Sequence, residues 1–171
     1  CLAAPPGLSP VAVSYRALST IEKRETLPSS WYLDLSLIAD YWSSNHRAHH
    51  TAPVNMIYGL RESLKLVFEE GLEIRWQRHN KFSKALKSGL KTMGLKLPIN
   101  PKIALDQLTV IEIPDGINDE QFRDNLLRKY LIEIGKGLGQ FQGKIWRVGL
   151  MGESCVSANV FALLQAFEQL L

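Results

Sequence analysis

The sequence is poor in cysteine, in long apolar runs and in charge of one sign. Cys1 and Cys155 are its two cysteines, and neither stands at a metal-ligand spacing from another cysteine or histidine. Two cysteines cannot build a disulfide framework, so we expect a reducing, cytoplasmic setting. No apolar run approaches the roughly 18 residues that a membrane helix needs, and the first residues lack a secretory pattern. We therefore expect no membrane partner.

Charge and hydrophobicity are those of an ordinary globular protein. The formal net charge is +3 over 171 residues, and the basic residues are scattered, which predicts no nucleic-acid partner. Hydrophobic residues make up 46% of the chain, which is enough to bury a core in one or two domains.

The first part of the chain reads as short elements between turns. Residues 8–14 alternate loosely and predict a short strand. The other expected elements are two helices and a polar loop, over residues 15–25, 33–42 and 43–51. This set does not make a domain by itself, so we expect residues 1–52 to be the C-terminal tail of a large domain.

Two long helical patterns meet at Gly71, a residue that favours a stop or a kink. We interpret residues 53–71 as a linking helix. The second pattern runs to Met93 and places its apolar residues on one face. That face is expected to hold Leu72, Trp76, His79, Phe82, Leu86 and Leu90. We expect His79 to be a core or interface histidine with satisfied nitrogens.

The last part of the chain alternates helices with strands. Strands are predicted over residues 108–113, 131–134 and 144–150, and helices over residues 118–130 and 157–171. This order is typical of helices layered on a small, mostly antiparallel sheet. We therefore expect residues 72–171 to form a small α+β C-terminal domain.

Two clusters invite a chemical interpretation that their surroundings do not favour. Gly135 to Gly139 has the spacing of a nucleotide loop, but a strand pattern follows where phosphate binding needs a helix. A flexible connection between two strands is the favoured interpretation. His46, His49 and His50 have no thiol or acidic ligand close in sequence, so we expect no metal there. A polar interface or an anion contact is favoured instead.

Arg147 interrupts an apolar strand pattern. Trp146 and Val148 would face one way and Arg147 the other. By pattern alone the guanidinium faces solvent or reaches an anionic ligand, and solvent is favoured. A buried guanidinium would need an anionic partner, and its fork suits a carboxylate.

Several short segments, taken together and in this order, have compatible spacing with a known family. They are Ala4–Gly7, Trp31–Asp34, His49–Pro53, Tyr58–Leu64, Gly137–Gly139 and Gly143–Gly152. They resemble the C-terminal half of the alanine–glyoxylate and serine–pyruvate aminotransferases, class V enzymes of fold type I. The resemblance covers essentially the whole chain and rests on the set of segments, because each one alone is short.

The resemblance implies an α/β pyridoxal-phosphate transferase fold, of which this chain would be the end of the large domain plus the small domain. It implies pyridoxal 5'-phosphate as cofactor and a homodimer. The reaction would be transamination between alanine or serine and glyoxylate or pyruvate, by a ping-pong Schiff-base mechanism. The Schiff-base lysine would stand immediately before Cys1, so the chain itself would carry no catalytic residue.

The resemblance also implies roles for particular residues. Arg147 would bind the α-carboxylate of the substrate, which replaces the solvent interpretation. Thr51 would reach the cofactor phosphate of the neighbouring subunit. The family often carries a tyrosine three positions before this threonine, and Ala48 stands there, so His49 or His50 would compensate. Of these two, His50 is the expected cofactor contact.

Two other interpretations stay open. The chain could belong to another class V enzyme, such as a phosphonate or phosphoserine aminotransferase or a desulfurase. A desulfurase needs a reactive cysteine on a mobile loop, whereas Cys155 stands near the start of the last helix. Alternatively, the residues after 94 could form a free-standing α+β ligand-binding or regulatory module without catalysis.

Overall fold

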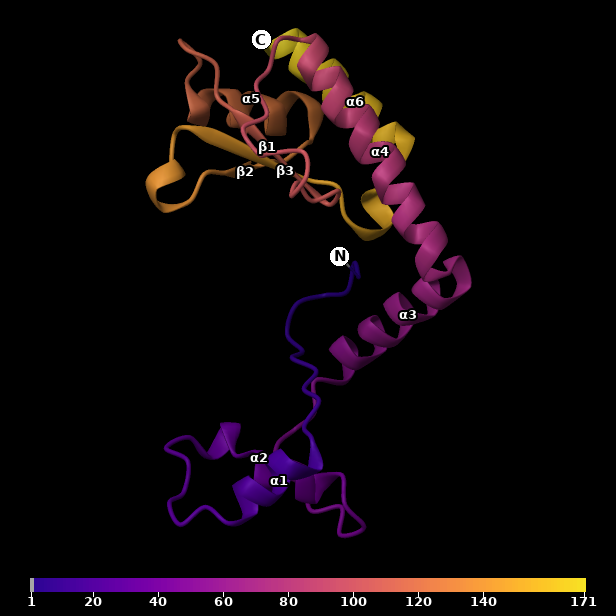
Figure 1. Cartoon of the computed structure of the whole chain (residues 1–171), viewed down its shortest axis with the longest axis vertical. Coiled ribbons are helices and arrows are strands. Elements are labelled where there is room, and N and C mark those ends of the chain that lie inside the picture. Colours follow the sequence, from indigo (N-terminus) through magenta and orange to yellow (C-terminus); the bar gives the residue numbers. More distant parts are fainter. Residues whose placement is uncertain (1) are drawn as a thin grey trace. The chain divides into compact units, whose positions relative to one another are not determined.

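The computed structural model describes residues 2–171, which divide into two units (Figure 1). One unit comprises residues 5–60. The other comprises residues 61–171 together with residues 2–4. The division falls inside helix α3 (Val54–Glu70). None of the helices formed by the described residues is both long and apolar enough to cross a bilayer.

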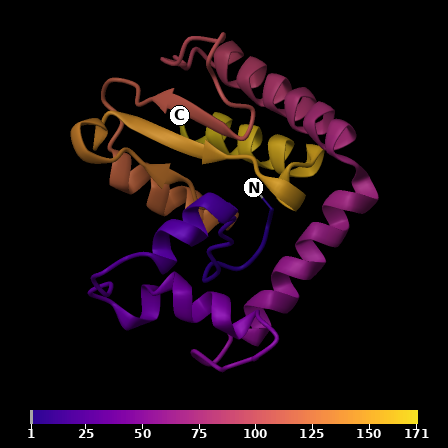
Figure 2. The same cartoon turned by 60° about the horizontal axis from the view of Figure 1, so that its bottom comes forward.

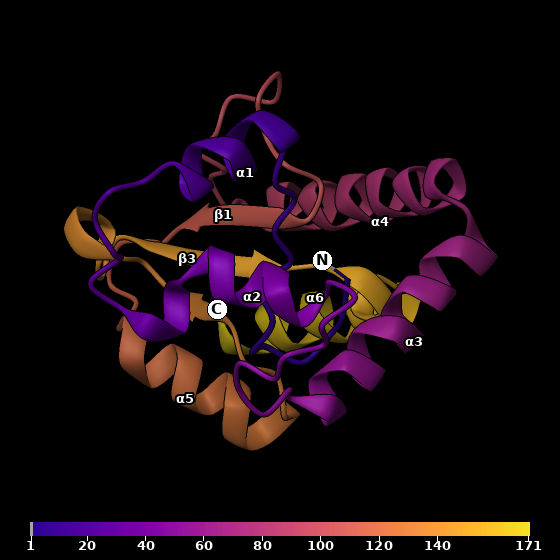
Figure 3. The same cartoon turned by 90° about the horizontal axis from the view of Figure 1, so that it is seen from below.

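The unit of residues 5–60 consists of short helices joined by irregular segments (Figure 3). Its elements are α1 (Tyr15–Glu22), the 3₁₀ helix η1 (Trp31–Leu33), α2 (Leu35–Tyr41) and the start of α3. Side chains cap both short helices: the Ser14 hydroxyl accepts from the Ala17 N–H at 3.3 Å, and the Asp34 carboxylate accepts from the Ser36 N–H at 2.9 Å. The two predicted helices are confirmed.

The strand predicted over residues 8–14 is wrong. These residues form no element, and the only sheet among the described residues pairs three strands from the other unit. A strand exists only where a neighbour completes its ladder of hydrogen bonds. An alternating pattern in the sequence does not by itself supply that neighbour.

The unit that begins at residue 61 carries the sheet and the longer helices. Its elements are α4 (Leu72–Thr92), β1 (Leu108–Glu112), α5 (Asp119–Tyr130), β2 (Gly135–Lys136), η2 (Gly139–Phe141), β3 (Ile145–Gly149), η3 (Gly152–Ser154) and α6 (Ser157–Leu170). The strands pair antiparallel in the order β1-β3-β2, and α6 runs along the sheet (Figure 2). The predicted helices-on-antiparallel-sheet arrangement is confirmed.

The strand predicted over residues 131–134 is wrong, because this segment closes helix α5. Leu131 adopts a left-handed conformation with a φ of 57°, and its N–H donates to the carbonyl of Leu127 at 2.9 Å. The Ile132 N–H still bonds to the last turn, at the Leu126 carbonyl. Pairing with β3 begins only at Gly135.

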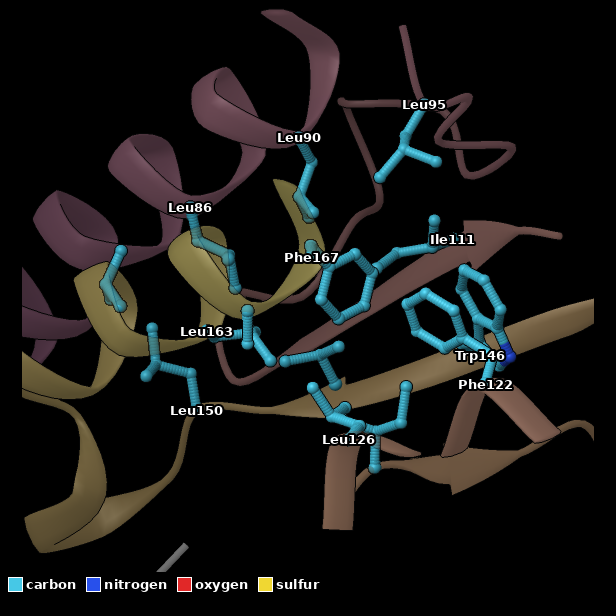
Figure 4. Close-up of a cluster of buried hydrophobic side chains, with 14 of the residues drawn as sticks. Leu86, Leu90, Leu95, Ile111, Phe122, Leu126, Trp146, Leu150, Leu163 and Phe167 are labelled. Carbon is cyan, nitrogen blue, oxygen red and sulfur yellow. The ribbon is translucent and has the colours of Figure 1, made fainter. Parts of the chain in front are cut away.

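An aromatic cluster forms the centre of the core between the sheet and α5 and α6 (Figure 4). The rings of Phe122 and Trp146 stack with centroids 4.2 Å apart, and the ring of Phe167 meets both edge-on. The Trp146 indole N–H donates to the Asp119 carboxylate at 3.0 Å, so its polar atom is satisfied. Burial of each such ring stabilises the fold by about 2–3 kcal/mol.

Helix α4 packs differently from its predicted face. The expected members Leu86, Leu90 and His79 are buried, but Leu72 and Trp76 are 55% and 60% exposed. In the first turns of α4 a buried Arg75 takes the place predicted for those apolar side chains. The helical period was interpreted correctly, but the pattern could not show that a charged residue finds its partners inside.

Candidate functional site

Arg147 lies on the face of the sheet opposite to the core. Its neighbours Trp146 and Val148 on β3 are buried, with 0% and 4% exposure, whereas Arg147 is half-buried. β3 is the central strand, and residues directly opposite in adjacent strands share a face. Arg147 is therefore flanked by Val110 of β1 and Gly135 of β2. The stacked indole on one face fixes the strand that carries the guanidinium on the other.

The guanidinium of Arg147 is held at one nitrogen. Its Nε–H donates to the main-chain carbonyl of Lys136 at 2.9 Å. Within residues 2–171 it forms no ion pair with a carboxylate. The donors on Nη1 and Nη2 therefore keep their capacity to bind an anion.

Unlike Arg147, two arginines of α4 are engaged in ion pairs. Arg75, 6% exposed, pairs with Glu70 at 2.7 Å and with Glu153 at 2.9 Å. Arg78 also pairs with Glu70, through Nε and Nη2. The hydrogen bonds from Arg78 and then Arg75 lower the pKa of Glu70 to about 2. These arginines serve the fold, which sets them apart from Arg147.

The same cluster fixes the turn that follows β3. Arg78 donates to the carbonyls of Gly152 and Cys155 at 3.0 and 2.7 Å. His79 is 4% exposed; its Nδ1 lies 2.8 Å from the carbonyl of Arg75, and its Nε2 accepts from the Gly152 N–H at 3.2 Å. A carbonyl only accepts, so Nδ1 carries the proton. The satisfied core histidine predicted at position 79 is confirmed.

Sequence reasoning missed Arg75 and Arg78. Their signal was a pair of arginines five and eight residues after Glu70, which stands next to a helix-breaking glycine. An apolar helical template assigns no partner to a charged residue, so it gives no indication that the two guanidiniums pair with Glu70. A buried guanidinium needs such a carboxylate, and here Glu70 supplies it to both arginines.

Cys155 is a free thiol with 0% exposure, while Cys1 lies outside the described residues. Burial raises the pKa of the Cys155 thiol, which favours its protonated form. A nucleophilic cysteine must be an accessible thiolate. Cys155 therefore lacks the properties that a desulfurase requires of its cysteine.

In the unit of residues 5–60, the histidine pair lies against two aromatic residues. The His49 ring stacks on Trp31 with centroids 4.3 Å apart, and the His50 ring lies 5.1 Å from that of Tyr32. His49 Nε2 lies 3.0 Å from the Trp31 carbonyl, and the two Nδ1 atoms of His49 and His50 lie 2.8 Å apart. Thr51 follows directly and is exposed.

These contacts fix the protons of the pair. His49 must donate from Nε2 because a carbonyl only accepts, so in its neutral form its Nδ1 accepts from His50 Nδ1–H. The Nε2 of His50 is then an acceptor when the ring is neutral and a donor when the ring is charged. A contact from His50 Nε2 to an anion therefore requires one added proton on the pair, carried by either ring.

A cavity of about 400 Å³ lies beside the histidine pair, within the same unit. Its lining includes both histidines and the aromatic side chains Tyr32, Tyr41 and Trp42. The three residues predicted to contact cofactor or substrate are thus divided. His50 and Thr51 adjoin each other in one unit, and Arg147 belongs to the other.

The glycine-rich segment turns the chain between two neighbouring strands, but its first two residues form the strand β2 that was expected at residues 131–134. β2 and β3 pair antiparallel, and only the short η2 lies between them. A Cβ at Gly137 would lie 1.9 Å from the carbonyl oxygen of Phe141, so this close turn requires glycine. The described residues contain no group of three or more histidine, cysteine or acidic side chains placed to hold a metal ion.

Comparison with known proteins finds relatives that match this chain over nearly its whole length. No family model matches it. Over 189 residues it is 39% identical to (S)-ureidoglycine–glyoxylate transaminase of Bacillus subtilis, covering 100% of the chain and 45% of that protein. It is 37% identical over 174 residues to alanine–glyoxylate aminotransferase of Callithrix jacchus, covering 99% of the chain and 42% of that protein.

A solved crystal structure has the same fold as this chain. Alanine–glyoxylate aminotransferase from Nostoc sp. is 43% identical, with a TM-score of 0.93, and the match covers 99% of the chain and 45% of that structure. Over its whole length the chain is similar to alanine–glyoxylate aminotransferases. It corresponds to the C-terminal half, and it spans about half the length of the curated relatives that it matches.

The similarity to this crystal structure confirms the expected class V, fold-type I architecture. The class uses pyridoxal phosphate, as the resemblance implied. The matches extend over 99% or more of the chain and are not confined to the residues after 94. A free-standing α+β module does not account for the similarity of the first 94 residues.

Proposed function

We propose that this chain works as the C-terminal half of a pyridoxal-phosphate aminotransferase that uses glyoxylate as amino acceptor, with pyruvate as a related acceptor. The donor is a small amino acid, alanine or serine, and the kinetics are ping-pong. The observation that carries the proposal is Arg147, a guanidinium with two free nitrogens on the face of the sheet opposite to the core. The choice of glyoxylate as acceptor is supported by the names of both curated relatives, which contain it.

Arg147 would bind the carboxylate that donor and acceptor share. Two parallel hydrogen bonds from Nη1 and Nη2 fix the plane of a carboxylate as well as its position. The rest of the substrate is thereby oriented toward the reacting centre, and such positioning is worth several kcal/mol of activation barrier. One residue serves both half-reactions, because each substrate carries the same group.

Thr51 and His50 would contact the phosphate of the cofactor, which supplies the electron sink for the reaction. The exposed Thr51 hydroxyl is a donor, and His50 donates from Nε2 when the histidine pair carries one added proton. These residue types fit a phosphate. In the proposed homodimer they serve the site of the neighbouring subunit, and His50 replaces the contact that Ala48 cannot make.

A second donor is favoured by one relative. The 39% identity to (S)-ureidoglycine–glyoxylate transaminase is as high as that to the alanine-dependent relatives, and both share the acceptor. (S)-Ureidoglycine also presents a carboxylate to Arg147, so the site as described accepts either donor. The difference between donors lies in the side chain, which Arg147 does not contact.

The test is a transamination assay on the complete enzyme with its cofactor. Glyoxylate is supplied as acceptor, and alanine, serine, (S)-ureidoglycine and phosphoserine are compared as donors by kcat/KM. Turnover with any of the first three supports the proposal and selects the donor. Turnover with phosphoserine alone would assign the chain to a different class V activity.

The cofactor contacts have a separate test. Thr51→Ala should weaken retention of the phosphate and raise the dissociation constant of the cofactor by about tenfold, one lost charge-assisted hydrogen bond. The measurement is cofactor absorbance after dialysis, together with the oligomeric state by sedimentation. A monomeric enzyme with full activity would rule out a contact from Thr51 to the cofactor of the neighbouring subunit.

A reducing, cytoplasmic setting belongs to the same proposal, supported by the free thiol of Cys155.

A further inference from the structure

We propose that Gly135 and the main-chain carbonyl of Lys136 are positioning groups that restrict Arg147 to one mode of carboxylate binding. In this mode the carboxylate meets the guanidinium end-on, at Nη1 and Nη2. The inference rests on the proposed function of Arg147 and specifies how the substrate carboxylate is held. Neither group touches the substrate, since both act through the guanidinium.

The carbonyl of Lys136 removes one of the two edges of the guanidinium. A guanidinium can bind a carboxylate with two parallel hydrogen bonds either through Nε and Nη2 or through Nη1 and Nη2. The Nε–H of Arg147 is committed to the Lys136 carbonyl at 2.9 Å. Only the end-on edge therefore retains both donors.

Gly135 leaves the space in which the guanidinium lies. It stands directly opposite Arg147 in the register of β2 and β3. A Cβ added at Gly135 would lie 3.2 Å from Nη2 and 3.5 Å from the Cβ of Arg147. The first distance is tighter than an ordinary contact, so the guanidinium would have to shift by a few tenths of an ångström.

The backbone at Gly135 does not itself demand glycine. Its φ lies outside the left-handed region, which side chains rarely adopt. Alanine is therefore compatible with the strand conformation, and the cost of a methyl group falls on the guanidinium. This separates Gly135 from Gly137, where a Cβ would collide with backbone.

The chain offers a matched control at Gly149. Gly149 lies two residues after Arg147 on the same strand and on the same face of the sheet, opposite Leu108. A Cβ there would lie 3.5 Å from the Cε of Met151, which is an ordinary van der Waals contact. Gly149→Ala makes the same chemical change without displacing Arg147.

The experiment measures the binding of propionate, an unreactive monocarboxylate, to the complete cofactor-loaded enzyme by titration calorimetry. We expect Gly135→Ala to weaken propionate binding about tenfold, because a small misplacement of a binding group carries a large cost. Gly149→Ala should stay within about twofold of wild type. Arg147→Ala should abolish measurable binding. In the assay, Gly135→Ala should raise KM for donor and acceptor by the same factor.

The outcomes separate the inference from the proposed function. Wild-type propionate affinity in Arg147→Ala would overturn the role of Arg147 itself. Loss of binding in Arg147→Ala together with wild-type affinity in Gly135→Ala would overturn only the positioning role. Thermal unfolding of both glycine variants identifies any failure to fold. In that case a crystal structure of the wild-type enzyme with propionate decides, and a carboxylate oxygen on Nε would contradict the end-on mode.

Discussion

The two units of this chain differ in what they bury. Every buried hydrophobic residue among the described residues lies in the unit that begins at residue 61, with Trp146 and Phe167 at its centre. In residues 5–60, by contrast, the one buried residue is Asp34, while Leu27 is 90% and Trp42 77% exposed. Local signals such as helix caps occur in both units. Only one of them therefore has the core that makes a folding unit stable.

The largest expected effect separates the units as fragments. We expect residues 61–171 expressed alone to unfold in one cooperative thermal transition, because they retain the whole aromatic core. Residues 5–60 alone should show no transition. The measurement is far-UV circular dichroism against temperature. Cooperative unfolding of the shorter fragment would remove the distinction between the units.

Two tryptophans sharpen the comparison within the intact chain. Trp146→Ala should reduce the free energy of unfolding by about 3–5 kcal/mol, because it leaves a large cavity in the core. Trp42→Ala is the matched control at 77% exposure, and it should change that free energy by about 0.5 kcal/mol or less. Urea titrations of both variants check this, and equal losses would contradict the account.

The ion-pair cluster makes the stability of the larger unit depend on pH. The pKa of Glu70 falls from an ordinary 4.5 to about 2 in the folded protein. A lowered folded pKa adds stability above pH 4.5, and this contribution is lost as pH falls toward 2. Glu70→Gln should therefore cost about 2 kcal/mol at pH 7 and little at pH 2. A pH-independent difference in urea midpoints would contradict this.

Two helix caps give the smallest effect. Asn118 caps α5 by accepting from the Gln121 N–H at 2.9 Å, so Asn118→Ala should cost about 1 kcal/mol. Ser14→Ala removes the corresponding cap of α1, which has no core to couple it to global unfolding, and should leave the unfolding midpoint unchanged. Chemical denaturation of both variants provides the test. A larger loss from Ser14→Ala would place α1 inside the cooperative unit.

Much of the larger unit could be predicted from its sequence, because its elements carry their own local signals. Asn118 and the charges that follow it marked α5, and alternation marked β1 and β3. Failures occurred where an outcome depends on a partner distant in sequence. Residues 8–14 have no neighbouring strand among the residues that the structure describes, and the pairing of Arg75 with Glu153 spans 78 residues.

The candidate site could be predicted from the sequence only in part. The pattern placed Arg147 on the face opposite Trp146, but it could not show the absence of a carboxylate partner. Its proposed role came from resemblance, and the structure adds the Lys136 carbonyl and the space above Gly135. The hydrogen bond between His49 and His50 likewise had no sequence signal beyond adjacency.

Unlike the arginines engaged in ion pairs, Arg147 keeps two donor nitrogens for the proposed substrate carboxylate. The most direct measurement is the rate of the amino-donor half-reaction against alanine concentration, for Arg147→Lys and for the control Arg128→Lys in the complete enzyme. A lysine cannot reproduce the fork, so Arg147→Lys should raise the half-saturating alanine concentration about 100-fold. Arg128→Lys, at an exposed pair, should leave it unchanged. Equal saturation of wild type and Arg147→Lys would contradict the assignment of Arg147 to the substrate carboxylate.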